Sequence, residues 1–286
     1  MNSTQRDATS RLIYKAAIQD DWDSVSHIFE TETENWRLNA EISLYGETPL
    51  YIAVGTNRSH RFVEQLVKQI MSGENGVEML RTCIKVGRPY NALHLAGKRG
   101  NLRDAKVLVE FDQELPQSAV VADDGGTTPL ELAAWKGHQE TVRYLMMVTK
   151  DVVGVTGTSP FRGTPGANIL TQTIATGLYD VALNLVKNYP DLVAEENYTG
   201  WETGFSRLAA KGNAFPRGYQ LSFWQRIIYS RIDDKECLVA DIENEGRGLT
   251  NNLLQRYFYI GSVSCWSIVS LYLGMKSTLI SYVQSV

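Results

Sequence analysis

Cysteine is scarce in this sequence, and the few cysteines form no pattern. Cys83, Cys237 and Cys265 are the only three in 286 residues, and they lie far apart. Their number and spacing fit neither a disulfide framework nor a set of metal ligands. We therefore expect a reduced intracellular setting, with no metal and no cofactor.

A strong charge of one sign is also absent. The formal net charge is −4, with 28 Lys and Arg against 32 Asp and Glu. Binding to nucleic acid normally needs a basic stripe, so we expect no nucleic-acid partner. The first residues are polar and lack the apolar stretch of a secretory signal, and we expect a cytoplasmic location.

No catalytic constellation stands out. The four histidines are spread along the chain, and no nucleophile with a base and no paired acid and base can be recognised. Residues 97–100, Gly-Lys-Arg-Gly, lack the glycine spacing and the Ser or Thr of a phosphate loop, so we interpret them as a helix end. The acidic stretch 233–245 has no EF-hand register and is interpreted as a solvated linker. We predict no enzyme activity and no small-molecule substrate.

The sequence does contain an internal repeat. Its clearest copy is Thr-Pro-Leu-Glu-Leu-Ala-Ala-Trp-Lys-Gly-His at 128–138. Other copies lie before and after it, at intervals of 36 to 43 residues. A period of this size predicts stacked helical hairpins, each of which buries its apolar face on its neighbours. Small residues that keep the helices close take equivalent places in the copies: Ala16, Ala53, Ala96, Ala133, Thr173 and Ala209.

The clearest copy also marks where its first helix begins and ends. Thr128 can cap free backbone N–H groups, and Pro129 loses no hydrogen bond at the first helical position. Gly137, like Gly100 in the preceding copy, can adopt the left-handed angles that end a helix. An apolar segment with helical spacing follows each glycine. The sequence therefore predicts a helix, a turn and a second helix in each copy.

The motif at 128–138, the turn at 123–126 before it and the apolar helix after it together resemble the ankyrin repeat. The variant Asn-Ala-Leu-His-Leu-Ala at 91–96 and the segment from Tyr189 to Trp201 are further similar to a large plant group of ankyrin proteins. Many members of that group continue into a C-terminal membrane domain. The resemblance implies an all-α solenoid of about five to six helix-turn-helix units with finger loops, which binds another protein without catalysis. It also implies that His94 and His138 hydrogen-bond loops.

The repeats divide the chain into three parts. We expect a disordered lead at 1–10, an array at 11–230 and a tail at 231–286. The loop 149–165, rich in Gly, Thr and Pro, is either a mobile flap or a spacer between two subarrays. The expected repeats lie near 11–42, 46–84, 89–122, 126–160, 166–198 and 201–230.

The tail leaves two alternatives open. Residues 257–275 carry no charge and have about the length that crosses a hydrocarbon core. Their four serines and two glycines make the segment less apolar than most membrane spans. The tail is either a helix pair that packs on the array, as in an intracellular adaptor or scaffold, or an anchor. In the second case the protein is a membrane-anchored signalling protein with a cytosolic ankyrin domain.

The resemblance also implies where a partner binds, namely on the finger turns and at the exposed positions before each helix-ending glycine. Trp135 is the most informative of these positions, because an exposed indole offers a large rigid contact. We expect a partner with an acidic rim around an apolar anchor, or else a Trp135 that folds back over an adjacent repeat. The candidate partner-binding residues are Arg88, Tyr90, Lys98, Arg99, Asp123, Asp124, Trp135, Lys136 and Trp201.

Overall fold

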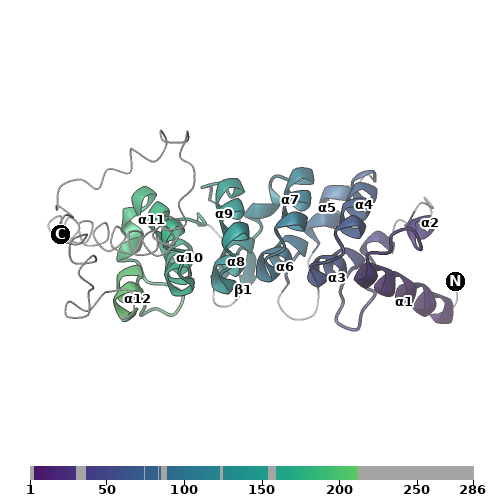
Figure 1. Ribbon diagram of the computed structural model, residues 1–286, viewed down its shortest axis with the longest axis horizontal. Helices are drawn as coiled ribbons and strands as arrows, with labels where there is room; N and C mark the ends of the chain where they lie inside the picture. The colour runs from purple at the N-terminus through teal and green to yellow at the C-terminus, as the bar shows by residue number, and fades with distance from the viewer. Residues whose placement is uncertain are drawn as a thin grey trace, which may run out of the picture.

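The computed structural model describes residues 3–29, 37–73, 75–82, 84, 89–122, 125–153 and 159–211. In this part of the chain the helices form an elongated array, with its first and last repeats at opposite ends (Figure 1). Helices in one row pack directly on one another, and we call them the inner helices. They are α1 (Ser3–Gln19), α3 (Pro49–Thr56), α6 (Ala92–Arg99), α8 (Pro129–Lys136), α10 (Gly163–Thr176) and α12 (Gly204–Ala210).

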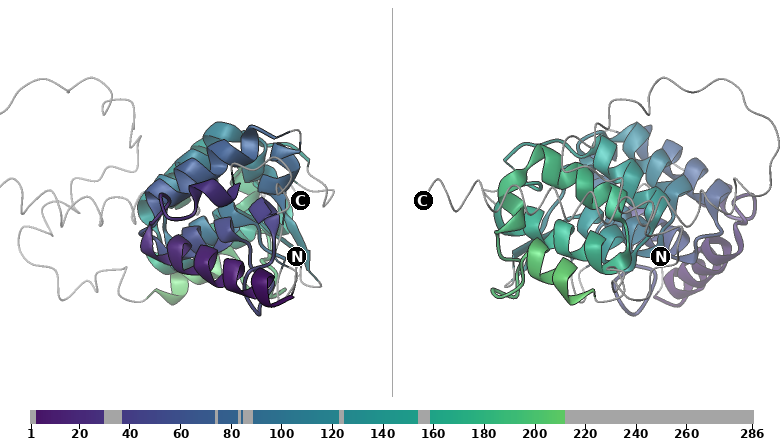
Figure 2. Two further views of the ribbon diagram at one scale, coloured as in Figure 1. Left: turned by 90° about the vertical axis from the view of Figure 1, so that its right-hand side faces the viewer. Right: turned by 60° about the vertical axis from the view of Figure 1, so that its left-hand side comes forward.

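A second row of helices covers one side of the inner row. Seen along the array, the helices of successive repeats overlap in these two layers (Figure 2). The outer helices are α2 (Ser26–Phe29), α4 (His60–Met71), α5 (Gly76–Arg81), α7 (Leu102–Phe111), α9 (Gln139–Val148) and α11 (Tyr179–Asn188). Two short 3-10 helices, η2 (Leu115–Gln117) and η3 (Pro190–Val193), follow α7 and α11. This arrangement confirms the all-α solenoid of stacked helical hairpins.

The only strands in the described residues form one small hairpin in a finger loop. Strand β1 (Val120–Ala122) pairs in antiparallel register with β2 (Gly125–Thr127). The hairpin leads directly into Thr128, which caps α8. It therefore positions a finger at the start of an inner helix and does not add a layer to the fold.

The predicted helix boundaries of the central repeats are confirmed. The Thr128 side chain accepts a hydrogen bond from the N–H of Glu131, and the Glu131 carboxylate accepts one from the N–H of Thr128. Gly100 and Gly137 adopt φ values of 72° and 73° and end α6 and α8. A Cβ on Gly100 would also lie 2.5 Å from the ring of His138. Glycine at this position therefore serves both the turn and the contact with the next repeat.

The small residues of the repeat lie between the inner helices. Ala53, Ala96, Ala133 and Thr173 are fully buried. Ala209 differs, because it is exposed in the last described helix. Small side chains therefore let each inner helix approach the next along the described array.

Each repeat also binds the end of the inner helix before it. The last carbonyls of a helix have no partner within the helix. Here a side chain from the following repeat donates to them. The donor and acceptor pairs are Ser59 to Ile18, Asn101 to Val54, His138 to Lys98 and Lys211 to Ala175. The Thr176 hydroxyl also lies 3.4 Å from the carbonyl oxygen of Ala134, but it is closer, at 2.8 Å, to that of Gln172 in its own helix.

Two predicted boundaries were wrong. Helix α1 begins at Ser3, so residues 3–10 are helical and not a disordered lead. No glycine or proline interrupts the chain before Gly46, and the helix can therefore extend ahead of its packed part. Helix α10 begins at Gly163, with Pro165 in its first turn, where a missing N–H costs no hydrogen bond. The fifth repeat was expected to begin near residue 166.

The loop between α9 and α10 is not a spacer in its described residues. Helices α8 and α10 pack directly. The Asp151 carboxylate accepts hydrogen bonds from the hydroxyls of Ser159 and Tyr189 and from Arg162. The two ends of the loop are therefore held together at the C-terminal end of α11.

Several expectations fall outside the described residues. They are the second helix of the sixth repeat, the tail 231–286 and the uncharged segment 257–275. Among the helices that the structure describes, none is both long and apolar enough to cross a membrane.

Candidate functional site

A groove of about 590 Å³ runs across four inner helices. It starts at α3, crosses α6 and α8, and reaches α10 and the last finger. Aromatic and aliphatic side chains make up about half of its lining, and polar or charged side chains make up the rest. The lining residues are Tyr51, Ile84, Tyr90, Lys98, Thr127, Glu131, Leu132, Trp135, Asn168, Gln172 and Tyr198.

Trp135 is the largest exposed side chain in this groove. It lies in the last turn of α8 and is 52% exposed. The Lys136 ammonium lies 3.9 Å from the centre of the indole ring, a cation–π distance. The ring is thus held in place by its neighbour while a large part of it stays open to solvent.

Tyr90 does not protrude as a finger residue, contrary to our expectation. It is only 7% exposed, and its ring stacks on that of His94 with the ring centres 5.4 Å apart. Tyr90 comes directly before Asn91, the N-cap of α6, so its side chain folds over the first turn of the helix. The Lys98 ammonium lies 5.8 Å from the tyrosine ring and lines the same groove.

The histidines of the repeat motif join neighbouring repeats. His94 meets a finger loop, as the resemblance implied, whereas His138 meets the last turn of α6. His94 is fully buried, its Nδ1 lies 2.7 Å from Asn91 Oδ1, and its Nε2 lies 3.0 Å from the carbonyl oxygen of Thr127. Burial lowers the pKa of His94 to about 4, so the ring is neutral at neutral pH. His138 Nε2 lies 3.1 Å from the carbonyl oxygen of Lys98. The two histidines therefore stabilise the stacking of neighbouring repeats.

Glu131 forms part of the groove floor, but its carboxylate is already bound. One oxygen accepts the Thr128 N–H at 2.8 Å. The other lies 3.3 Å from the Tyr198 hydroxyl and 3.4 Å from the Asn168 amide nitrogen, which both donate to it. The side chain is 2% exposed. Glu131 therefore organises the groove and does not offer a free negative charge.

The α10 side of the groove carries amide side chains. Asn168 takes the place that Thr128 has in the preceding repeat, but it lies inside α10 and does not cap it. The early start of α10 therefore frees the Asn168 side chain to face Glu131. Gln172, one helical turn later, lines the groove and is half-buried. Neither residue was among the predicted binding residues, because the sequence does not reveal the early start of α10.

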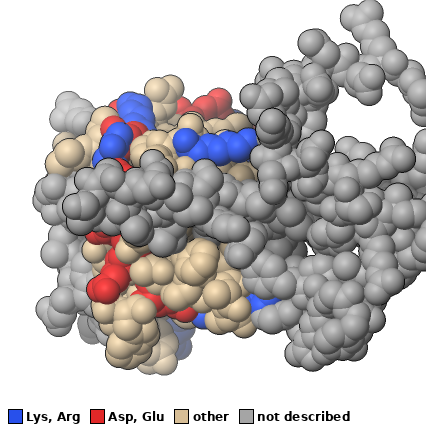
Figure 3. Space-filling view, turned by 90° about the vertical axis from the view of Figure 1, so that its left-hand side faces the viewer, with Lys and Arg blue, Asp and Glu red and all other residues tan. Residues whose placement is uncertain are grey.

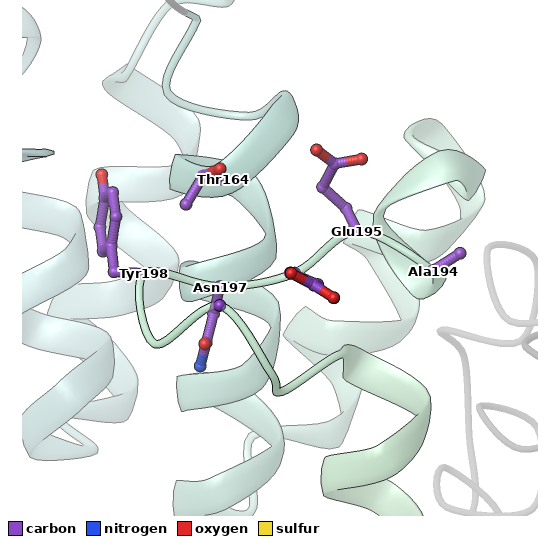
Figure 4. A pocket seen from close by; sticks show the side chains of 7 residues that line it. Thr164, Ala194, Glu195, Asn197 and Tyr198 are labelled. Atoms are coloured by element: carbon purple, nitrogen blue, oxygen red, sulfur yellow. The ribbon is translucent and has the colours of Figure 1, made fainter.

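A second cavity of about 540 Å³ lies at the last finger (Figure 4). Thr164, Glu195, Glu196, Asn197 and Tyr198 are among the residues that line it. Asn197 is buried, and its Oδ1 accepts the N–H of Thr199 at 2.9 Å, which stabilises the finger turn. Tyr198 lines both cavities, so the last finger contributes to both.

The C-terminal end of the array carries both signs of charge. Lys and Arg side chains are interspersed with Asp and Glu on the described surface of this end (Figure 3). Mixed charges of this kind do not create a large field of one sign. No group of three His, Cys, Asp or Glu side chains that could hold a metal ion is found in the described ranges.

The other candidate residues lie outside the groove or outside the described residues. Arg99 is exposed in the last turn of α6, and Trp201 is 80% exposed in the last finger. Neither lines the groove. The structure does not describe Arg88, Asp123 and Asp124. The groove thus brings together Tyr90, Lys98 and Trp135, with Lys136 packed on the indole.

Comparison with known proteins agrees with this geometry. The family model for ankyrin repeats (3 copies) matches residues 65–154. No curated protein matches the chain. Ankyrin repeats generally mediate protein–protein interaction and form a non-catalytic module. The likeness to the plant group stays a prediction. Residues 65–154 of this chain are ankyrin repeats, and the described helices form an all-α ankyrin-repeat solenoid.

Proposed function

We propose that this protein is a non-catalytic adaptor or scaffold that binds a partner protein in the inner groove. Trp135 is the central contact of this site. Lys98 and Lys136 beside it favour a partner with acidic groups around an apolar anchor. The scattered cysteines support an adaptor that works inside the cell.

The exposed indole of Trp135 carries this proposal. Its ring is not folded away over an adjacent repeat, because 52% of the residue is exposed. Tryptophan is enriched among residues that dominate binding energy, especially where a groove surrounds it. A side chain that the fold does not need to bury is free to serve a partner.

The test compares partner capture by the wild-type chain and by Trp135→Ala. Proteins that the wild-type chain retains from cells of its source are identified by mass spectrometry, and the affinity of each purified candidate is then measured. A central anchor contributes 2 kcal/mol or more, so we expect the variant to bind a true partner at least roughly 30-fold more weakly. The free energy of unfolding should change by no more than about 1 kcal/mol.

Met147→Ala is the matched control. Met147 is also a large exposed apolar residue, at 77%, but it lies on the outer helix α9. Its replacement should leave partner affinity unchanged. Equal loss of binding in both variants, or a Trp135→Ala chain that unfolds, would contradict the proposal.

A further inference from the structure

The groove is long. Packed helices lie roughly 8–10 Å apart, so a groove across four inner helices is roughly 25–30 Å long. Its lining residues come from helices that follow one another along the array, from Tyr51 on α3 to Gln172 on α10. An extended chain laid along such a groove can place side chains against each of these helices.

Gln172 offers hydrogen bonds that suit an extended backbone. Its side-chain amide makes no hydrogen bond with any residue that the structure describes, although the residue is half-buried in the groove wall. A carboxamide has one acceptor oxygen and two N–H donors. The N–H and C=O groups of an extended segment have no internal partners and can pair with both sides of this amide. A helix satisfies its own backbone groups and has only side chains to offer to this amide.

Two lysine side chains give the groove positive charge. Lys98 lines the groove, and Lys136 packs on Trp135. Within the described ranges neither ammonium forms a salt bridge, in contrast to Lys68, which pairs with Glu64 at 2.7 Å. The nearby Glu131 carboxylate is bound by backbone and side-chain donors. Charge at the centre of the groove therefore favours acidic side chains on the ligand.

From these three features we infer that the partner contributes an extended, acidic segment to the groove. At about 3.3 Å per residue, roughly eight residues span it. An apolar side chain of the segment packs on Trp135, Asp or Glu residues beside it face Lys98 and Lys136, and the Gln172 amide binds the backbone. This inference rests on the proposed function, because it names the partner chemistry of the same groove.

The test uses random twelve-residue peptides displayed on phage and the full-length chain as bait. Peptides that also bind the Trp135→Ala chain are removed before sequencing. We expect the remaining peptides to be enriched in Asp and Glu around one aliphatic or aromatic residue. Their synthetic forms should bind roughly tenfold or more weakly to the Lys98→Ser, Lys136→Ser double variant, and several-fold more weakly to Gln172→Ala.

Lys187→Ser is the control for the lysine variants, because Lys187 is exposed on the outer helix α11. It should leave peptide affinity unchanged. The circular dichroism spectrum of each complex, after subtraction of the spectra of the free chain and the free peptide, should show no gain of helix. A helical gain would overturn the extended conformation.

The remaining outcomes separate the inference from the proposed function. The selected Trp135-dependent peptides could be basic, or could bind the Lys98→Ser, Lys136→Ser double variant as tightly as the wild-type chain. Either result would overturn the acidic segment, while the groove would keep its proposed function. In another outcome, the phage selection yields no peptide that depends on Trp135, while the cellular partner still requires Trp135. That result would overturn the acidic extended segment, because the partner would then bind through a folded surface. Loss of Trp135 dependence in both experiments would refute the proposed function itself.

Discussion

The helix α8 packs on α6 on one side and on α10 on the other, and the two interfaces are built differently. On the α6 side, Gly97 lies so close to α8 that a Cβ would be 2.4 Å from the carbonyl oxygen of Pro129. On the α10 side, the polar residues Asn168 and Gln172 face the groove, and Asn168 reaches Glu131. The first interface sets the spacing of the array, and the second leaves polar side chains for a ligand.

The difference between the two interfaces arises from one change in the fifth repeat. In the fourth repeat the Thr128 side chain caps α8, so its oxygen already binds a backbone N–H group. In the fifth repeat α10 starts five residues before the equivalent position, so Asn168 has no N–H group to cap. An irregular helix start can therefore convert a structural position into one that is available for binding.

Replacement of Gly97 should have the largest effect on stability. In Gly97→Ala the new methyl group meets a backbone atom, which cannot rotate away, so α6 and α8 must separate. We expect a loss of about 3 kcal/mol, although alanine itself is a better helix former than glycine by about 1 kcal/mol. Thermal unfolding should show a transition lower by roughly 10 °C.

Gly55→Ala tests whether the effect is specific to the α6–α8 contact. A Cβ on Gly55 would lie 3.1 Å from the Leu95 side chain, which can move. The loss should be at most about 1 kcal/mol. Similar transitions in both alanine variants would show that the close approach at Pro129 does not set the spacing.

The buried His94, which joins α6 to the finger before α8, should make stability depend on pH. Its pKa is lowered to about 4 in the folded state, whereas an unfolded histidine titrates near 6.5. Between these values the unfolded state binds a proton that the folded state does not, so acid favours unfolding. The contribution is complete above pH 6.5 and is lost as the pH falls to about 4, by on the order of 2–3 kcal/mol.

Chemical denaturation at several pH values measures this dependence. The variant His94→Gln keeps a polar side chain but cannot titrate. Its stability should start lower and fall less between pH 6.5 and 4 than that of the wild-type chain. An unchanged slope would mean that other groups control the acid sensitivity of the array.

The two equivalent cap positions should respond differently to alanine. Thr128→Ala removes a side chain that binds the N–H of Glu131, and a lost N-cap costs about 1 kcal/mol. Asn168→Ala should cost less than about 0.5 kcal/mol, because Asn168 caps nothing and its bond to Glu131 is long. Denaturant unfolding of the two variants compares these costs. Equal costs would show that Asn168 stabilises the fold as much as a cap does.

The smallest effect on stability is expected for Gln172→Ala. The side chain has no hydrogen-bond partner within the described residues, and alanine is a good helix former. The free energy of unfolding should change by about 0.5 kcal/mol or less, as calorimetry can show. A larger loss would mean that Gln172 serves the α8–α10 interface and not a ligand.

Much of the fold could be predicted from local patterns. The Thr-Pro start, the helix-ending Gly100 and Gly137, and the apolar spacing between them act within one repeat, and short-range physics decides them. The exposure of Trp135 was implied by the resemblance to ankyrin repeats, in which positions before such a glycine are exposed. The burial of Tyr90 and the early start of α10 did not follow, because both depend on how the chain enters a helix that its neighbours hold.

The sequence by itself determined that this chain forms a stack of helical hairpins, since a repeated apolar face can be buried only on a copy of itself. It also determined where the central helices begin and end. Only the tertiary structure decided which side chains meet across repeats. The groove joins residues from Tyr51 to Tyr198, and Glu131 is bound by donors of its own repeat and of the next. Those contacts depend on the spacing and rotation of neighbouring helices, which no single repeat encodes.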